Sequence, residues 1–171
     1  MNKIKKIFVS CGEMSGDLHL SYLIKEIKKI DPKVEFHGVV GDKSIQEGAI
    51  KLNHIKENDV MGFVEALKKY KYFKKKSLEY LTYIKDNKID TVIFVDFGGF
   101  NLKFFELIKK NKLPVKTIYY IPPKVWAWGK KRIKKLKLFD EVIVIFPFEK
   151  EYFDNIEKKS GLHVEYFGNP L

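Results

Sequence analysis

The sequence has a single cysteine, Cys11, and only two tryptophans, and it contains no long apolar run. One cysteine excludes an internal disulfide and suits a reducing compartment. No apolar stretch approaches the roughly 20 residues that a helix needs to span a bilayer. The short apolar segment near the N-terminus runs straight into a glycine turn, so we expect no signal peptide. These absences favour a cytoplasmic protein.

Acidic residues are few relative to basic ones. The chain has 22 Asp and Glu against 33 Lys and Arg, which leaves a formal net charge of +11. Such an excess favours an anionic partner: nucleic acid, a phosphorylated substrate or an acidic lipid surface. A purely compositional lysine bias is the alternative, because lysine is spread along the whole chain.

Apolar, β-branched runs alternate with helical patterns along the 171 residues, which suffice for one domain with a sizeable core. Strands are expected at 4–10, 34–40, 91–97, 115–121, 141–146 and 164–167, with a weaker candidate at 49–54. Helices are expected at 17–30, 43–48, 63–86, 102–110, 130–139 and 148–159. This alternation predicts an α/β fold: a Rossmann-like, doubly wound, mostly parallel sheet. Gly, Asn and Pro at 168–170 are typical of a connection, so we expect the first half of a longer protein.

The first expected strand leads into a turn with an unusual acid. Glu13 lies between Gly12 and Gly16, and Ser15 and Asp17 complete the turn. A strand, a glycine turn and a helix expose backbone N–H groups to a ligand. The alternative is that the glycines only form the turn, Ser15 or Asp17 caps the helix, and Glu13 is solvated.

A second acid, Asp96, lies at the end of the expected strand 91–97. The carboxyl ends of neighbouring parallel strands meet at one edge, where open α/β sheets bind ligands. We therefore expect Glu13 and Asp96 to share one cleft. Two carboxylates there shift each other's pKa values, and one can serve as a general base. The alternative is that Asp96 caps the next helix.

Two further segments could bind a ligand. Trp126 and Trp128 lie on a strand-to-helix loop close to Arg132, a combination that suits a sugar face, an acyl chain or a phosphate, although the rings could equally be buried anchors. The expected helix 63–86 combines an apolar stripe with many lysines and with tyrosines such as Tyr72. A helix of this kind can lie on an anionic membrane, and a solvated lysine face is the alternative.

Together, these motifs resemble the lipid-A-disaccharide synthase family, glycosyltransferases with the two-domain GT-B architecture. The resemblance includes Gly-Glu-Met-Ser-Gly-Asp at 12–17 and Val-Trp-Ala-Trp at 125–128. In order and spacing it continues through segments 36–41, 60–65, 95–96, 100–102, 146–149 and 168–171. The chain departs from the family pattern at Gly99, Pro122 and Asn169, where an aspartate, a serine and a histidine are usual.

The resemblance implies an inverting transfer of 2,3-diacylglucosamine from its UDP conjugate to 2,3-diacylglucosamine 1-phosphate. The products are the β-1,6-linked lipid A disaccharide 1-phosphate and UDP. It implies no cofactor, no metal and no nucleic acid, and a peripheral position on the cytoplasmic face of the inner membrane. It also implies that residues 1–171 form the N-terminal acceptor-binding domain, inactive without a C-terminal UDP-sugar-binding half.

The resemblance also assigns roles to residues. Asp96 would be the base, and Glu13 would orient the acceptor or support the acid–base step. Residues expected to hold the acceptor sugar and its 1-phosphate are Gly12, Ser15, Gly16, Asn101, Trp126, Trp128 and Arg132. Residues expected to contact acyl chains or the membrane are Met61, Phe63 and Tyr72.

Three other functions remain open from the sequence. Another GT-B sugar transferase would share the fold and differ in its acceptor. A basic nucleic-acid- or membrane-binding α/β module would use the charge, although no RNP, KH or helix-turn-helix signature is present. A dinucleotide-binding oxidoreductase would need Gly-x-Gly-x-x-Gly after the first strand, where Glu13 would instead repel a pyrophosphate.

Overall fold

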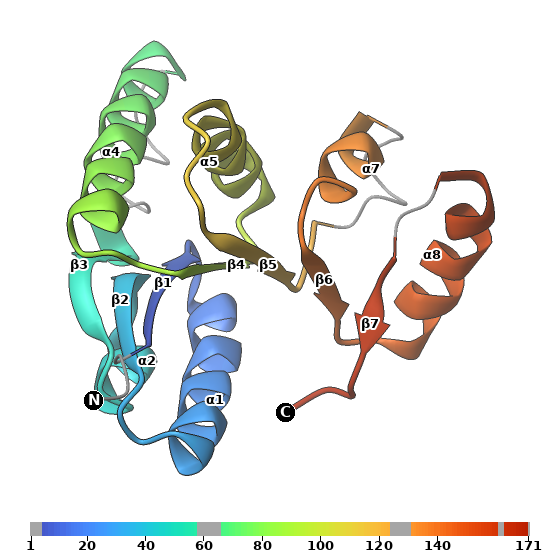
Figure 1. The fold of residues 1–171 in the computed structure, drawn as a ribbon, viewed down its shortest axis with the longest axis horizontal. Helices are drawn as coiled ribbons and strands as arrows, with labels where there is room; N and C mark the ends of the chain where they lie inside the picture. The colour runs from blue at the N-terminus through green and yellow to red at the C-terminus, as the bar shows by residue number, and fades with distance from the viewer. Residues whose placement is uncertain (1–4, 58–65, 124–130, 161–162, 171) are drawn as a thin grey trace.

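The computed structural model describes residues 5–57, 66–123, 131–160 and 163–170. Within these residues the chain forms one seven-stranded sheet in the order β3-β2-β1-β4-β5-β6-β7, with parallel pairing throughout (Figure 1). The strands are β1 (Lys6–Cys11), β2 (Glu35–Val40), β3 (Ile50–His54), β4 (Thr91–Val95), β5 (Lys116–Tyr120), β6 (Glu141–Val144) and β7 (Glu165–Tyr166). The α/β, Rossmann-like fold class expected from the sequence is confirmed.

Helices cover both faces of the sheet, with α1 and α2 on the face opposite α4 and α5 (Figure 1). The helices are α1 (Met14–Ile30), α2 (Asp42–Gln46), α4 (Ala66–Asp86), α5 (Gly98–Lys110), α7 (Lys131–Leu136) and α8 (Pro147–Ser160). From β1 the chain runs outward to β3 and then returns to β4 on the other side of β1. This reversal is the topological switch point at which such sheets bind ligands.

Aromatic side chains fill the core between the sheet and α5. The rings of Phe94 and Phe104 have their centroids 5.9 Å apart, and Phe105 stacks on Phe139 at 3.6 Å. Burying a phenylalanine side chain stabilises the fold by about 1.5–3 kcal/mol. These contacts fix α5 over the middle of the sheet, and with it the turn that precedes α5.

Most expected elements are present, with local differences. The weak strand candidate at 49–54 is β3, an edge strand. The expected strand 91–97 ends instead at Val95, because Asp96 and Phe97 both have a φ of 47° and leave the extended conformation. The start of the expected helix 63–86 lies outside the described residues. Within the described part of the chain, none of the helices has the length and apolar character needed to cross a bilayer.

Candidate functional site

The carboxyl ends of β1 and β4 lie side by side at the switch point. Cys11, the last residue of β1, pairs in register with Val95, the last residue of β4. The turns that carry Glu13 and Asp96 therefore leave the sheet from adjacent strands at the same edge. That the two carboxylates share one cleft stays a prediction.

Two glycines let these turns touch. A Cβ on Gly12 would lie 2.0 Å from Cγ of Phe97, so the Phe97 ring occupies the space of the missing side chain. A Cβ on Gly16 would lie 3.0 Å from Sγ of Cys11 and 3.8 Å from Cβ of Asp96. The glycines expected to bind the acceptor thus have a packing role: they bring the first turn of α1 against the β4–α5 turn.

The backbone at this edge is strained. Asp96, Phe97 and Ile121 all have positive φ values, of 47°, 47° and 60°, which non-glycine residues seldom adopt and β-branched ones least of all. Such residues cost about 1–3 kcal/mol each and persist where the surroundings determine them. Here the Asp96 N–H donates to the carbonyls of Tyr120 (3.3 Å) and Ile121 (3.2 Å). These hydrogen bonds hold the strained, half-buried Asp96 at the sheet edge.

Asn101 lies beneath the site, fully buried. Its amide oxygen accepts a hydrogen bond from the Ser10 hydroxyl at 2.6 Å. Its amide nitrogen donates to the carbonyls of Ser10 (3.1 Å), Val95 (3.3 Å) and Asp96 (2.8 Å). The side chain therefore ties α5 to the ends of β1 and β4. Asn101 thus supports the Asp96 turn from within the protein, and its expected contact with the acceptor stays a prediction.

Glu13 and Ser15 lie at the surface of the same turn, and both are exposed. Glu13 is the N-cap residue of α1, where its carbonyl accepts the Asp17 N–H at 3.0 Å and its side chain makes no capping hydrogen bond. The Glu13 side chain is therefore exposed at the N-terminus of α1.

Negative charge converges on this edge. Burial, together with the carboxylates of Asp17, Asp96 and Glu13, raises the pKa of the Cys11 thiol to about 12. The thiol also donates a hydrogen bond to the Glu13 carbonyl at 3.3 Å. Cys11 is therefore a neutral packing residue. Its raised pKa reflects the negative charge of three carboxylates, from two turns, that surround the end of β1.

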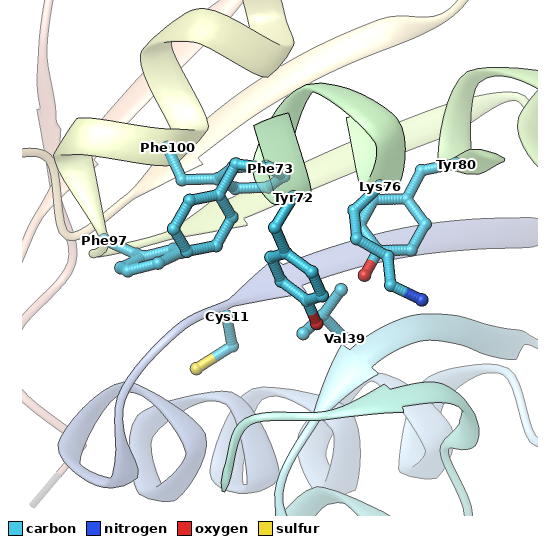
Figure 2. A pocket seen from close by; sticks show the side chains of 8 residues that line it. All are labelled: Cys11, Val39, Tyr72, Phe73, Lys76, Tyr80, Phe97 and Phe100. Atoms are coloured by element: carbon cyan, nitrogen blue, oxygen red, sulfur yellow. The ribbon is translucent and has the colours of Figure 1, made fainter. Parts of the chain in front are cut away.

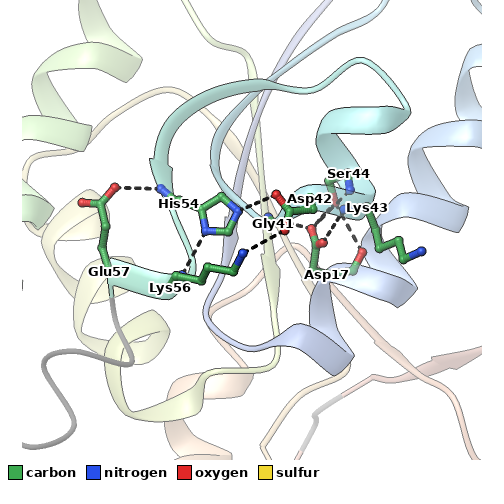
Figure 3. A network of polar contacts seen from close by, with 8 residues as sticks. All are labelled: Asp17, Gly41, Asp42, Lys43, Ser44, His54, Lys56 and Glu57. Atoms are coloured by element: carbon green, nitrogen blue, oxygen red, sulfur yellow. Dashed lines mark hydrogen bonds and ion pairs between the residues drawn. The ribbon is translucent and has the colours of Figure 1, made fainter.

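Asp17 has a role that the sequence analysis did not assign. The sequence left open that Asp17 caps its own helix, but its buried carboxylate caps α2 instead (Figure 3). It accepts hydrogen bonds from the N–H groups of Gly41 (2.8 Å) and Lys43 (2.9 Å) and from the Ser44 hydroxyl (2.5 Å). The contact joins the start of α1 to the loop after β2, which only the folded chain brings together.

His19 is a second residue that the sequence analysis missed. It lies one turn after Gly16 on α1, is 8% exposed, and meets the Tyr120 ring edge to face with centroids 6.4 Å apart. The Asp96 carboxylate acts on its pKa. The sequence signal that could have identified His19 is a histidine near the start of a helix that directly follows a candidate ligand-binding loop.

The other expected site residues are placed only in part. Burial raises the pKa of the Tyr119 hydroxyl, which donates to the Asp96 carbonyl at 2.9 Å. The charge of Arg132, half-buried on α7, opposes that rise. Arg132 thus acts on the same corner of the molecule as Asp96. The remaining expected contacts lie outside the described residues: Met61, Phe63, Trp126 and Trp128.

Tyr72 was expected to contact acyl chains or the membrane. Figure 2 shows it on α4 among aromatic side chains that close over Cys11 and Val39. The enclosed space is about 10 Å³, room for roughly one water. Burial raises the pKa of the Tyr72 hydroxyl. Tyr72 therefore packs α4 onto the sheet edge, although it remains half-exposed.

A much larger groove of about 680 Å³ lies between α4 and α5. Its lining is mostly apolar, with Lys74, Lys103 and Glu106 as charged members, and it reaches Phe97 and Gly99 beside the Asp96 turn. The uncharged lining residues are Tyr70, Phe73, Ser77, Leu78, Phe97, Gly99, Phe100 and Leu107. The volume falls within the range of small-molecule sites. In the described ranges no group of three or more His, Cys, Asp or Glu residues is placed to hold a metal ion.

Comparison with known proteins gives a consistent result. Residues 7–171 match the model of a family described as lipid-A-disaccharide synthetase. The chain is 41% identical over 172 aligned residues to a lipid-A-disaccharide synthase of Persephonella marina, covering 98% of this chain and 42% of the relative.

Two more relatives show the same pattern. Lipid-A-disaccharide synthase 1 of Legionella pneumophila (strain Philadelphia 1) is 35% identical and covered to 44%, and the synthase of Geobacter metallireducens is 35% identical and covered to 42%. The chain thus spans less than half the length of these curated relatives. Since the family model matches nearly all of the chain, the chain belongs to the lipid-A-disaccharide synthetase family.

Proposed function

We propose that this chain is the acceptor-binding part of an inverting GT-B glycosyltransferase of lipid A synthesis. The reaction transfers 2,3-diacylglucosamine from its UDP conjugate to the 6-hydroxyl of 2,3-diacylglucosamine 1-phosphate. The observation that carries the proposal is the meeting of the Asp96 turn with the glycine turn at the switch point, beside an apolar groove. Family membership names the reaction, and this geometry offers it a site.

Asp96 is the base in this proposal. A single displacement at the anomeric carbon needs a carboxylate within hydrogen-bond reach of the attacking hydroxyl. Asp96 is half-buried at the sheet edge, and its backbone is held by the carbonyls of Tyr120 and Ile121 and by Asn101. A fixed carboxylate orients the hydroxyl for attack. Glu13, exposed one turn away, orients the sugar.

The groove between α4 and α5 receives acyl chains. Each methylene of an acyl chain that this apolar lining buries stabilises binding by about 0.8 kcal/mol. Lys74 and Lys103, which line the groove, supply charge for the acceptor's 1-phosphate. The groove reaches Phe97 and Gly99, so a chain bound there leaves its sugar next to Asp96.

The donor and the membrane complete the proposal. The UDP conjugate binds to a second half, which corresponds to the part of the longer relatives that this chain does not cover. Both substrates are anionic lipids, and a chain of net charge +11 is suited to the cytoplasmic leaflet from which they are drawn.

Binding of the acceptor to this chain tests the proposal. We expect 2,3-diacylglucosamine 1-phosphate to bind, and unacylated glucosamine 1-phosphate to bind far more weakly. Gly99→Trp should weaken acceptor binding by about tenfold, because the tryptophan side chain fills groove space that would otherwise bury roughly two methylenes of an acyl chain. Gly99→Ala is the matched control, since a Cβ there meets nothing within 4 Å. Equal binding of both sugars would favour another GT-B acceptor, and salt-dependent retention of random DNA would favour a nucleic-acid-binding module.

A further inference from the structure

The groove between α4 and α5 has a direction. The two helices lie on the same face of the sheet (Figure 1). α5 begins just after β4, so it starts at the carboxyl edge of the sheet. α4 ends at Asp86, shortly before β4 begins at Thr91, so it also runs away from that edge. The groove therefore leads from the candidate site toward the opposite edge of the sheet.

The lining residues give the length of the groove. On α4 they extend from Tyr70 to Leu78, and on α5 from Gly99 to Leu107. At 1.5 Å per residue, each set covers about 12 Å of helix. An extended alkyl chain advances about 1.25 Å per methylene, because its carbon–carbon bonds of roughly 1.5 Å meet at near-tetrahedral angles. The groove therefore matches an alkyl chain of about ten carbons.

The charged residues of the lining differ along its length. Side chains on a helix lean toward its N-terminus, so Lys74 and Lys103 reach back toward the carboxyl edge. Nζ of Lys103 lies 5.5 Å from the centre of the Tyr70 ring, at the near end of the groove. Glu106 lies about one turn further along α5 and contributes an acid to the lining. These charges direct the polar end of an anionic lipid to the lysines and its alkyl end toward Glu106.

The Glu106 carboxylate is held in place by α7. Its Oε1 lies 2.7 Å from Nζ of Lys135, and both side chains are half-exposed. An alkyl chain that covers this carboxylate removes its water, and burying a charge is costly unless every partner is kept. A chain that continues past Leu107 also leaves the apolar lining. Added methylenes therefore gain nothing once the chain reaches this point.

We propose that Glu106 sets the length of the acyl chain that the groove accepts. One acyl chain of an anionic lipid lies along the groove with its polar end at the lysines, and chains beyond about ten carbons stop gaining affinity at the Glu106 carboxylate. This rests on the proposed function, in which the groove receives acyl chains. It extends that function by naming the residue that limits chain length.

Binding of monoalkyl phosphates to the chain tests this limit without a sugar. A series from hexyl to tetradecyl phosphate is titrated calorimetrically, each member below the concentration at which it forms micelles. The affinity should rise about fourfold for each added methylene up to decyl phosphate. From decyl to tetradecyl phosphate it should stay within about twofold. An affinity that keeps rising through tetradecyl phosphate, or no binding by any member, would overturn the proposal.

Variants identify the residue that sets the limit. Glu106→Leu should extend the accepted length, so that dodecyl phosphate binds about tenfold more tightly than decyl phosphate. Lys135→Gln is the matched control, because it breaks the same ion pair but keeps the carboxylate, and its limit should remain at decyl phosphate. Lys103→Gln should weaken every member by a similar factor, since it removes charge at the polar end. A limit unmoved by Glu106→Leu, or moved equally by Lys135→Gln, would refute the role of Glu106.

A second variant and a second ligand keep the outcomes separate. Should Glu106→Leu lower the thermal midpoint of the chain, Glu106→Gln decides, because it keeps the size of the side chain and removes only its charge. It should move the limit in the same direction. If 2,3-diacylglucosamine 1-phosphate fails to bind while the alkyl phosphates show the limit, the proposed acceptor is wrong and the length limit stands. If the acceptor binds and the limit is absent, only the role of Glu106 falls.

Discussion

At the residue scale, the candidate site depends on space left by glycine. Gly12 has no positive φ, so glycine is not required at this position for its conformational freedom. Its missing side chain makes room for the Phe97 ring, 2.0 Å from where Cβ would be. A packing requirement of this kind joins two turns that are more than 80 residues apart in the sequence.

This contact predicts the effect of Gly12→Ala. The added methyl group overlaps the Phe97 ring, and overpacking of this kind costs about 2 kcal/mol. Urea unfolding should show the loss as a lower midpoint. Gly99→Ala, in a position with open space, should leave the midpoint unchanged or slightly higher, because alanine favours a helix more than glycine does. Equal midpoints for the two variants would contradict the packing argument.

Asp17 gives a second prediction at this scale. Asp17→Asn replaces a carboxylate oxygen with an N–H₂ group that faces the N–H donors of α2, so a buried charged cap is lost. We expect the free energy of unfolding to fall by about 3 kcal/mol. Thermal or urea unfolding measures it. Asp42→Asn, on the exposed side of the same network, should have little effect; a comparable loss there would argue that surface charge, not the cap, matters.

The positions of some of these residues could be predicted from the sequence, whereas those of others could not. Asp96 and Glu13 could be placed at one edge because parallel strands align their carboxyl ends. The burial of Asn101 could not be predicted, since it depends on α5 standing directly over the ends of β1 and β4. The same holds for His19, whose surroundings come from β5 and the β4–α5 turn.

At the element scale, α4 is amphipathic in an unusual way. Lys71, Lys74 and Lys75 are exposed and follow the 3–4 spacing of one helix face. Tyr70 and Leu78, exposed at 52% and 48%, line the mouth of the groove beside them. Lysines around an exposed apolar opening suit a surface of anionic lipid.

A vesicle-binding experiment tests this assignment. Glutamine at positions 71, 74 and 75 should weaken binding to phosphatidylglycerol-containing vesicles by roughly a hundredfold, at about 1 kcal/mol for each lysine. The control replaces Lys25, Lys29 and Lys33, which are exposed on and after α1, on the other face of the sheet. It changes the net charge equally and should cost little binding. Similar losses for both triple variants would mean that total charge alone decides.

Element boundaries show where sequence reasoning stops. The periodic helices and apolar strands were predicted because burial imposes their patterns. The end of β4 was predicted two residues too late, because Asp96 and Phe97 read as strand residues but adopt left-handed conformations. Those conformations depend on hydrogen bonds to β5 and from Asn101, which no local pattern contains.

At the scale of the whole molecule, the candidate ligand site lies at the carboxyl ends of the central strands of the sheet. The order of the strands puts β1 and β4 at the centre, with β3 and the two-residue β7 at the edges. The Asp96 turn, the glycine turn and the groove all lie near this central switch point. In the proposed function this edge binds one sugar, whereas a transfer between two sugars needs a second site.

This division predicts that the chain binds the acceptor without turnover. With 2,3-diacylglucosamine 1-phosphate and its UDP conjugate both present, we expect no UDP release above that of heat-denatured chain. The physical reason is that the departing diphosphate needs its own cationic and N–H donors, and in the proposed function the acceptor occupies the central edge. Should UDP appear, Asp96→Asn decides its origin. UDP that persists in the variant comes from contamination, whereas UDP lost with Asp96 would show that residues 1–171 bind both sugars.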